Sequence, residues 1–540
     1  MTSTAAPTAT VFNYSYSYRE PDRSAGATPA IRKIVIVGGG TAGWMTALIL
    51  AHALIAKGVE IELVESPVVG IIGVGEGSTP WLRGFFDRLG IEESEWMPEC
   101  NATYTCGITF DRWSTVPGFE SYFHPFASML DNLTMTQFVQ NTQARLNGVD
   151  VCAHPNRFFI ASYLAQRKLA PKPGRNFPFD VWYGYHFDAV LLGQYLHKRA
   201  VERGVKYRSC HLTEAKLDER GDIASVSTRE GDAITADFFV DCTGFAGMLV
   251  QKALATPYLS FGENLFNDSA VAMPTPMGEA ISCQTVSTAM RHGWAWEIPL
   301  TNRYGNGYVY SSAFCSPDEA ERELREKLGL LDSDTPARHL KMKIGRVTKH
   351  WNRNCLAVGL AQGFIEPLEA TALLFIQRTA DAFVEVLEAG DMGEGARERF
   401  NKKINDHFEG TRDYIVTHYK TNTRGDTEYW RANAQNPNIS ESLKELYAIW
   451  MSGKSIAADV GRQALGKGYP IFSWYCILSG MGVFPAKDKL RPANGRDRHY
   501  DMDEIDNLLT RSATNFRSQK EVLADIPKKV DEKSLQIYFW

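Results

Sequence analysis

The chain has 540 residues, of which 44% are hydrophobic and 22% are charged, so it can bury the core of two tightly associated globular domains. Its formal net charge of -5 gives no electrostatic reason to expect a nucleic acid or an anionic membrane surface as partner, and a small molecule is the better prediction. The nine cysteines include no CxxC pair and no His–Cys cluster with zinc spacing, which predicts a reduced cytoplasmic protein without a metal site.

The first thirty residues are rich in Thr, Ala, Ser, Pro and Tyr and lack the continuous apolar segment of a signal peptide. We therefore predict that residues 1–30 form a disordered tail. No later run is long enough to span a bilayer, so no membrane partner is predicted. The sequence does not decide between a monomer and a homodimer.

A strand, a helix and a second strand are predicted from about Arg32 onward. Residues 34–37 form an all-apolar run, typical of a strand that is buried on both faces. Residues 44–55 supply an apolar segment of helical length, and residues 59–64 alternate as a strand does. The pattern predicts a βαβ unit.

Three glycines in the spacing GxGxxG separate the first strand from the helix, as a dinucleotide-binding fingerprint requires. Gly38 would make the turn, Gly40 would admit the pyrophosphate, and Gly43 would let helix and strand pack closely, while the helix N-terminus offers its unpaired N–H groups. Glu65 closes the second strand, 22 residues beyond the last glycine, where a carboxylate can bind ribose hydroxyls. The predicted contacts of this segment are Gly38, Gly40, Thr41, Ala42, Gly43 and Glu65.

Further strands and helices are spread over the rest of the chain, which one nucleotide-binding domain with insertions explains better than a string of small domains. We place an α/β domain with inserted substrate-side segments over residues 31–375 and a mainly helical region that completes the substrate site over residues 376–540. The predicted strands are residues 238–242, 307–312 and 354–359, and the predicted helices are residues 377–387, 396–418 and 440–450.

Two segments favour FAD over NAD as the dinucleotide. Residues 239–244 resemble the second FAD contact of the glutathione-reductase class of flavoproteins, and residues 359–367 resemble the third. The predicted fold is therefore an FAD-binding Rossmann-like domain of the glutathione-reductase/hydroxybenzoate-hydroxylase type. No second GxGxxG with a following acid appears, so a separate flavin reductase is expected to supply reduced FAD, although some single-component monooxygenases bind NADPH without that fingerprint. The other predicted cofactor contacts are Leu212, Thr243, Gly244, Leu360 and Leu373.

Three segments together resemble the flavin-dependent tryptophan halogenase family. Residues 293–299, GWAWEIP, match its GWxWxIP motif, and residues 364–371, FIEPLEAT, resemble its EPLEST segment. Residues 73–80, GVGEGSTP, resemble its GVGEAT strap over the flavin, which implies cofactor contacts at Gly75, Glu76 and Gly77. The similarity runs from about residue 31 to residue 485.

The resemblance implies a reaction and residues that serve it. Reduced FAD would react with oxygen to give a flavin C4a-hydroperoxide, a halide would attack it, and the hypohalous acid would travel to an aromatic substrate held away from the flavin. Trp294 and Trp296 would form the partition between the two compartments, or would simply pack in a core as large aromatic residues do. Thr371 and Ala372 would bind chloride or bromide through their backbone.

Glu369 corresponds to the catalytic carboxylate of that family, which supports the oxidant and can take the proton that an aromatic ring loses on substitution. Its apolar neighbours Pro367, Leu368 and Ala370 are expected to disfavour the charged form by desolvation, which suits proton transfer near neutral pH. The alternative is an ion-paired acid at a helix N-terminus.

Thr105 stands where the family has a lysine thought to handle activated halogen. A neutral hydroxyl neither forms a haloamine nor carries a positive charge, which argues against halogenation by the usual route. No lysine lies between Lys57 and Lys168, so a replacement must come from far along the chain.

The substrate end also departs from the family pattern. His124 and Phe126 match positions that sandwich the indole ring, and Tyr469 stands roughly where those enzymes have a tryptophan. The stretch before Trp474 is shorter than in those enzymes and lacks the aromatic and acidic residues with which they bind a free amino acid. We therefore predict an aromatic substrate other than free tryptophan, such as an indole derivative.

Three functions remain as alternatives at this stage. The first is a flavin-dependent oxygenase of halogenase ancestry that oxidises an aromatic substrate. The second is a true halogenase with a variant active site. The third is a flavin-binding protein without turnover of its own.

Overall fold

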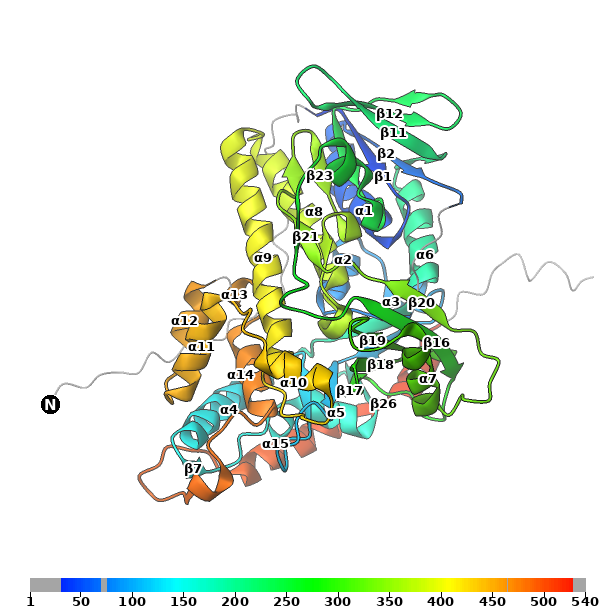
Figure 1. Ribbon diagram of the computed structural model, residues 1–540. Helices are drawn as coiled ribbons and strands as arrows, with labels where there is room; N and C mark the ends of the chain where they lie inside the picture. Colours follow the sequence, from blue (N-terminus) through cyan, green and yellow to red (C-terminus); the bar gives the residue numbers. More distant parts are fainter. Residues whose placement is uncertain (1–30, 69–74, 464, 528–540) are drawn as a thin grey trace, which may run out of the picture.

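The computed structural model describes residues 31–68, 75–463 and 465–527 (Figure 1). The predicted tail of residues 1–30 and the first residues of the strap, Gly73 and Val74, lie outside the described residues. Figure 1 shows one sheet with covering helices at one end of the molecule, and a second sheet with most of the C-terminal helices at the other end. The long helix α9 (Glu394–Lys420) contacts elements of both parts.

The first sheet is the parallel sheet that the glycine fingerprint requires. Its side chains alternate between two hydrophobic clusters, with Ile34 and Ile36 in one and Val35 and Val37 in the other, so both faces are covered. The strands predicted at residues 34–37, 59–64, 238–242 and 354–359 are confirmed as members of this sheet. The strand order is β10 (Lys206–Ser209), β2 (Glu60–Glu65), β1 (Lys33–Val37), β14 (Phe238–Asp241), β23 (Cys355–Ala357) and an antiparallel β22 (Trp351–Asn352).

Helices on this sheet lead directly to the C-terminal region. Helix α1 (Thr41–Leu54) packs against α6 (Ala189–Glu202) and against α8 (Ala372–Ala389). Because α8 packs on the nucleotide-side helix and extends past residue 375, it joins the parallel sheet to the helices that follow. The domain division at residue 375 stays a prediction.

The strand predicted at residues 307–312 forms, but it belongs to a different sheet. Strand β19 (Arg303–Tyr310) pairs antiparallel with its neighbours in a seven-stranded sheet and not with the parallel strands. The side-chain pattern of a strand does not name its pairing partner, so the sequence could not separate the two sheets. The order of this sheet is β20 (Arg338–Lys341), β16 (Ser269–Pro276), β19, β18 (Gly293–Pro299), β17 (Thr285–Ala289), β5 (Gly107–Asp111) and β6 (Ser121–Pro125).

A small sheet joins the strap to the position of the family lysine. Strand β9 (Gly184–Asp188) pairs with β3 (Gly75–Gly77) on one side and with β4 (Thr103–Thr105) on the other. The chains approach so closely that a methyl group on Gly184 would lie 2.1 Å from the carbonyl oxygen of Ser78. Thr105 is therefore held one strand away from the strap.

Helices make up most of the described chain after residue 376. The helices predicted at residues 377–387, 396–418 and 440–450 are confirmed as α8, α9 and α11 (Glu441–Met451). No helix within the described ranges is both long and apolar enough to cross a membrane. The other helices are α2 (Trp81–Arg88), α3 (Glu93–Trp96), α4 (Asp131–Leu146), α5 (Ile160–Arg167), α7 (Pro317–Leu328), α10 (Glu428–Gln435), α12 (Ala457–Arg462), α13 (Leu465–Gly468), α14 (Ile471–Gly480), α15 (Met502–Ala513) and α16 (Gln519–Ala524). The other strands are β7 (Val149–Asp150), β8 (Leu169–Pro173), β11 (Leu212–Leu217), β12 (Ile223–Thr228), β13 (Ala233–Ile234), β15 (Tyr258–Ser260), β21 (Gly345–Val347), β24 (Gly363–Phe364), β25 (Arg491–Pro492) and β26 (Phe516–Ser518).

Candidate active site

The three segments predicted to contact the dinucleotide lie next to one another. A methyl group on Gly38 would lie 2.2 Å from the carbonyl oxygen of Cys242, so the first segment touches the second. A methyl group on Gly359 would lie 2.6 Å from the Cβ of Ala42, so the third segment touches the first. The fold thus gathers residues that are more than three hundred positions apart in the sequence at one end of the parallel sheet.

The glycine turn has the geometry that a bound dinucleotide requires. Gly38 has a φ of +114°, and a methyl group on Gly43 would lie 1.9 Å from the carbonyl oxygen of Gly38. Gly40 differs, because no atom would lie within 4 Å of an added methyl group, which leaves room for a pyrophosphate. Helix α1 starts at Thr41 without a capping side chain or an acidic residue in its first turn, so its free N–H groups suit an anion. Half-buried Glu65 ends β2 beside this turn.

The second segment uses its side chains to fix its own turn. The Thr243 hydroxyl donates to Asp241 Oδ1 at 2.6 Å and accepts from the Met248 backbone N–H at 2.8 Å. Gly244 follows with a φ of +66°. A cofactor contact at this point would therefore come from the backbone. The apolar cofactor candidates are buried Leu212, half-buried Leu360 and buried Leu373.

The described part of the strap reaches the segment that carries Glu369. A methyl group on Gly77 would lie 3.7 Å from the Cβ of Ala370. Burial, together with nearby Asp188, raises the pKa of the Glu76 carboxyl to about 7. Gly75 and Glu76 belong to the same strand, β3. The strap and the Glu369 segment are therefore in contact.

Glu369 is a buried carboxylate held between two histidines. It ends a short turn at Pro367–Glu369, and the next residue, Ala370, has a left-handed φ of +54° that directs the chain into α8. Its Oε2 lies 2.9 Å from His124 Nδ1, and its Oε1 lies 3.3 Å from His418 Nε2. The side chain of Glu369 is only 2% exposed. These contacts fit both predictions for Glu369, the catalytic carboxylate and the ion-paired acid at a helix N-terminus.

The hydrogen bonds of His124 assign its protons. Nδ1 faces the carboxylate of Glu369, so Nδ1 carries the hydrogen and donates it. Nε2 then accepts from the Ser473 hydroxyl at 2.9 Å. Both ring nitrogens of His124 therefore have a hydrogen-bond partner.

His418 has the opposite arrangement. Its Nδ1 donates to the backbone carbonyl of Tyr414 at 3.2 Å, so Nε2 carries a lone pair when the ring is neutral. The Tyr122 hydroxyl donates to that lone pair at 3.0 Å. The same nitrogen faces Glu369, so a proton placed on the carboxylate has an acceptor beside it.

The expected net shift of the Glu369 pKa is wrong in sign, although burial acts in the expected direction. Burial alone would raise the pKa of the carboxyl, but His124 and His418 reverse this effect and the pKa lies below the ordinary value. Burial lowers the pKa of His418, although Glu369 works in the opposite direction. Glu369 is therefore ionised and His418 neutral near pH 7. The prediction for Glu369 failed because its neighbours along the chain are apolar, whereas its neighbours in space are two imidazoles.

Thr105 offers no substitute for the family lysine. Its side chain is buried and its hydroxyl donates to the carbonyl oxygen of Gly107 at 3.2 Å. Lys172 comes close to this strand, with its Nζ 5.6 Å from the ring centre of Tyr104. That ammonium group donates to Glu93 at 2.9 Å, so it is already engaged. The side chains of Tyr104 and Thr105 point to opposite faces of β4, which directs Lys172 away from Thr105.

The predicted substrate residues gather on the other side of the carboxylate. His124 and Phe126 lie at the end of β6, and both are buried. Tyr469 stacks on Tyr414 with 3.7 Å between ring centres and 12° between ring planes. Among the described residues, the buried hydroxyl of Tyr469 has no hydrogen-bond partner. His124 contacts the carboxylate directly, which the sequence did not predict.

The two tryptophans of the predicted partition are packed side by side. Trp294 and Trp296 lie on the same face of β18, with their ring centres 6.2 Å apart. Trp294 Nε1 donates to Glu366 at 3.3 Å, and the ring of Trp296 covers Gly307. They form a well-packed wall, which is compatible with both predicted roles.

The predicted halide residues lie where α8 begins. Thr371 is buried and precedes the first residue of the helix, exposed Ala372. Free backbone N–H groups at this helix end suit an anion. Ala372 is exposed, so its methyl group is not part of the buried core.

Four residues of the site were missed by the sequence analysis. Tyr414 and His418 lie one turn apart on the predicted helix at residues 396–418, so their spacing could have marked a shared face. Tyr122 lies two residues before His124 on the same face of its strand. Ser473 carried no signal, because it stands in an apolar helix with no neighbouring motif.

Comparison with known proteins now decides the family. A model of the tryptophan halogenase family matches residues 33–494. The tryptophan 6-halogenase SttH of Streptomyces toxytricini is 38% identical over 478 residues, covering 84% of this chain and 89% of that protein. The chain belongs to the tryptophan halogenase family. The solved structure of SttH superposes on this halogenase-family chain with a TM-score of 0.80 at 34% identity, over 92% of this chain and 100% of that chain.

Other relatives agree with this assignment. The tryptophan 7-halogenase RebH of Lentzea aerocolonigenes is 33% identical over 88% of this chain and 94% of that protein. Tar14, a tryptophan C-6 flavin-dependent halogenase from taromycin biosynthesis, has a TM-score of 0.79 at 35% identity, over 92% of this chain and 99% of that chain. This halogenase-family chain is thus a flavin-dependent enzyme with an FAD-binding Rossmann-like fold, as predicted. The alternative of a flavin-binding protein without turnover is set aside.

Proposed function

We propose that this halogenase-family enzyme uses reduced FAD and oxygen to substitute the ring of an aromatic, indole-type substrate, and that Glu369 takes the proton which the ring loses. The supporting observation is the ionised, buried carboxylate of Glu369 with the lone pair of His418 beside it. When bound at the glycine turn, reduced FAD supplies the two electrons that activate oxygen. The protein itself binds and orients the aromatic substrate and removes the ring proton.

The route of the proton follows from the hydrogen bonds. His124 Nδ1 lies 2.9 Å from Oε2 and 3.2 Å from Oε1, so it holds the carboxylate in place chiefly through Oε2, and Oε1 accepts the ring proton. From Oε1 the proton can move 3.3 Å to Nε2 of His418. Tyr122 then accepts a hydrogen bond from the imidazole where it previously donated one. The base is restored without bulk water, as general base catalysis in a closed site requires.

Thr105 decides which group is transferred, and we infer that this group is oxygen. Thr105 places a neutral, already bonded hydroxyl where relatives would need a cation for activated halogen. The ring C–H bond is then replaced by a C–OH bond, the ring proton passes to Glu369, and the second oxygen atom of dioxygen leaves as water. Halogenation is the second candidate function, because the family is defined by it and the chain retains Glu369 with a free helix end at Ala372.

The substrate is proposed to be an aromatic compound other than free tryptophan. Besides the short stretch before Trp474, the buried hydroxyl of Tyr469 supports this proposal. A buried hydroxyl without a partner is costly, so a substrate that offers it a hydrogen bond is favoured. Saturable binding of free tryptophan, measured by calorimetry, would contradict the proposal.

The supply of reduced FAD is proposed to come from a separate flavin reductase in the cytoplasm. Chloride or bromide would be needed only for the second candidate function. The chain is also proposed to divide near residue 375 into an FAD-binding part and a part that completes the substrate site.

The test is mass spectrometry of products made from a panel of indoles with reduced FAD and oxygen, with and without bromide. We expect oxygenated product in both reactions. Brominated product alone would reject oxygenation and support halogenation. Thr105→Lys should shift the products toward bromide dependence, whereas Thr109→Lys in the same segment should not.

A further inference from the structure

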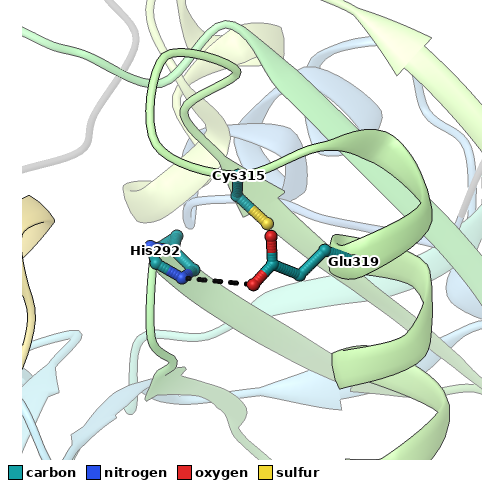
Figure 2. Close-up of side chains that lie close together, drawn as sticks. All are labelled: His292, Cys315 and Glu319. Atoms are coloured by element: carbon teal, nitrogen blue, oxygen red, sulfur yellow. Dashed lines mark ion pairs between the residues drawn. The ribbon is translucent and has the colours of Figure 1, made fainter.

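Three side chains of metal-binding types converge at one end of the second sheet, away from the residues assigned to the reaction. The ligand atoms of His292, Cys315 and Glu319 all lie within 4.8 Å of one another. Nε2 of His292 is 3.9 Å from Oε1 of Glu319. Figure 2 shows the imidazole, the thiol and the carboxylate pointing toward one another. No metal was predicted here, because the residues are spread over a turn, a loop and a helix.

The backbone holds all three residues in place. His292 lies in the turn between β17 and β18, and its carbonyl accepts from the N–H of Ser311 at 3.2 Å. The N–H of Cys315 donates to the Ser311 carbonyl at 3.1 Å. Glu319 lies in the first turn of α7, where its N–H is capped by the Ser316 hydroxyl at 3.2 Å. The ligand positions are therefore set by hydrogen bonds that do not involve the ligand atoms.

A second acidic residue fixes the turn that carries His292. Glu323, one helical turn after Glu319, accepts from the backbone N–H of Arg291 at 2.8 Å and from the Tyr308 hydroxyl at 3.0 Å. Tyr308 in turn accepts from the backbone N–H of His292 at 2.8 Å. Helix α7 and this turn are thus tied together beside the three side chains.

The ligand atoms have few competing contacts. In the described part of the chain, Nδ1 of His292 is buried without a hydrogen-bond partner, and its Nε2 is too far from Glu319 for a hydrogen bond. The Cys315 thiol makes a weak contact of 3.4 Å with the Ser316 carbonyl. Nε2 of His292, the ring nitrogen that faces Glu319, is therefore open to a further partner.

We propose that His292, Cys315 and Glu319 bind a divalent transition-metal ion of the zinc type. A thiolate, an imidazole and a carboxylate suit zinc, and three protein ligands leave a fourth position for water. Ligand atoms around such an ion lie about 3.3–3.8 Å apart. Rotation of the exposed Glu319 side chain brings its carboxylate from the present 3.9 Å to within this distance of His292 Nε2. The ion fastens the start of α7 to the turn that precedes Trp294.

The competing explanation is an ion pair between His292 and an acid at a helix N-terminus. That pair would need no thiol, so Cys315 distinguishes the two explanations. The test therefore monitors the sulfur directly, using cobalt(II) as a spectroscopic probe of the zinc position.

The experiment titrates the chelator-treated full chain with cobalt(II) and records difference spectra, so that absorption by flavin cancels. We expect one cobalt per chain with a thiolate-to-cobalt band in the near ultraviolet, and displacement by one equivalent of zinc. Cys315→Ser should remove the band, and Glu319→Gln should weaken binding about tenfold or more. Cys210 is a half-buried cysteine outside the cluster, and Cys210→Ser should leave both the thiolate-to-cobalt band and the cobalt affinity unchanged.

Absence of the band in the wild-type chain at saturating cobalt would overturn the proposal. A band that persists in Cys315→Ser would also overturn it, because the sulfur would then come from another cysteine. Exposed Glu319 allows Glu319→Gln to fold even if the cysteine variant does not, and cobalt affinity unchanged in Glu319→Gln would likewise reject the site.

Discussion

The dinucleotide turn and the Glu369 site are built in opposite ways. The turn lies within residues 38–43, and Gly38 and Gly43 each have a local steric reason, either a positive φ or a backbone atom closer than a methyl group allows. The Glu369 site takes His124 from β6, His418 from α9 and Ser473 from α14. Local backbone geometry can be read from adjacent residues, whereas the charge state of a buried acid depends on residues that only the fold brings near.

The largest expected effect is at the carboxylate. Glu369→Gln should lower product formation by about 10²–10⁴-fold, because the amide keeps the shape but cannot take a proton. Flavin binding and Tm should stay close to wild type. Glu366→Gln is the matched control, since Glu366 is also buried, three residues away, and binds Asn267 at 2.7 Å. Equal losses in both variants would show that the distinction between the two acids is wrong.

Two glycine substitutions test the local turn. Gly43→Ala should destabilise the fold by about 3 kcal/mol, because its methyl group would meet the Gly38 carbonyl oxygen. Gly40→Ala should change stability by only about 1 kcal/mol or less. It should still weaken FAD binding about tenfold or more, since the methyl group enters the space left for the pyrophosphate. Flavin titration and Tm separate the two outcomes, and normal FAD binding by Gly40→Ala would refute the assigned turn.

His418→Gln tests the proposed proton acceptor. Turnover should fall about tenfold to hundredfold with little change in KM, since the amide cannot store the proton. Because burial lowers the pKa of His418, the neutral imidazole is lost only as pH falls below the ordinary value of about 6.5. In the wild type, turnover should decrease in this pH range as His418 becomes protonated. The pH dependence of turnover in this range should change in His418→Gln. His350→Gln, at another fully buried histidine, should keep the wild-type pH profile. An identical pH profile in His418→Gln would remove His418 from the route.

The smallest effect concerns stability at acid pH. His186, between the strap and β4, is buried, and burial lowers its pKa to about 3. Below about pH 6.5 the unfolded chain therefore binds a proton at His186 that the folded chain does not bind. The free energy of unfolding decreases as the pH is lowered through this range. His186→Gln should reduce that loss by about 1.4 kcal/mol per pH unit between about pH 6 and pH 4. Urea unfolding at several pH values measures the difference, and parallel curves would contradict the assignment.

The sequence predicted elements better than it predicted their partners. The strand at residues 307–312 was found, but it pairs in the antiparallel sheet because its neighbours are set by chain reversal and not by its own side chains. Glu369 was identified by its motif, yet its ionisation was predicted with the wrong sign. His418 and Ser473 were not predicted, although the spacing of Tyr414 and His418 on their helix was a usable signal for the first of them. The convergence of His292, Cys315 and Glu319 was equally invisible along the chain.

The sequence by itself determined the dinucleotide turn, the principal strands and helices, and membership of a flavin-dependent halogenase family, because motifs of adjacent residues carry that information. Only the tertiary structure decided that Glu369 is ionised between two histidines, that the Thr105 hydroxyl is already bonded, and that Lys172 is held by Glu93. The physical reason is that proton affinity and charge pairing depend on distance through space, which the order of residues along the chain does not specify.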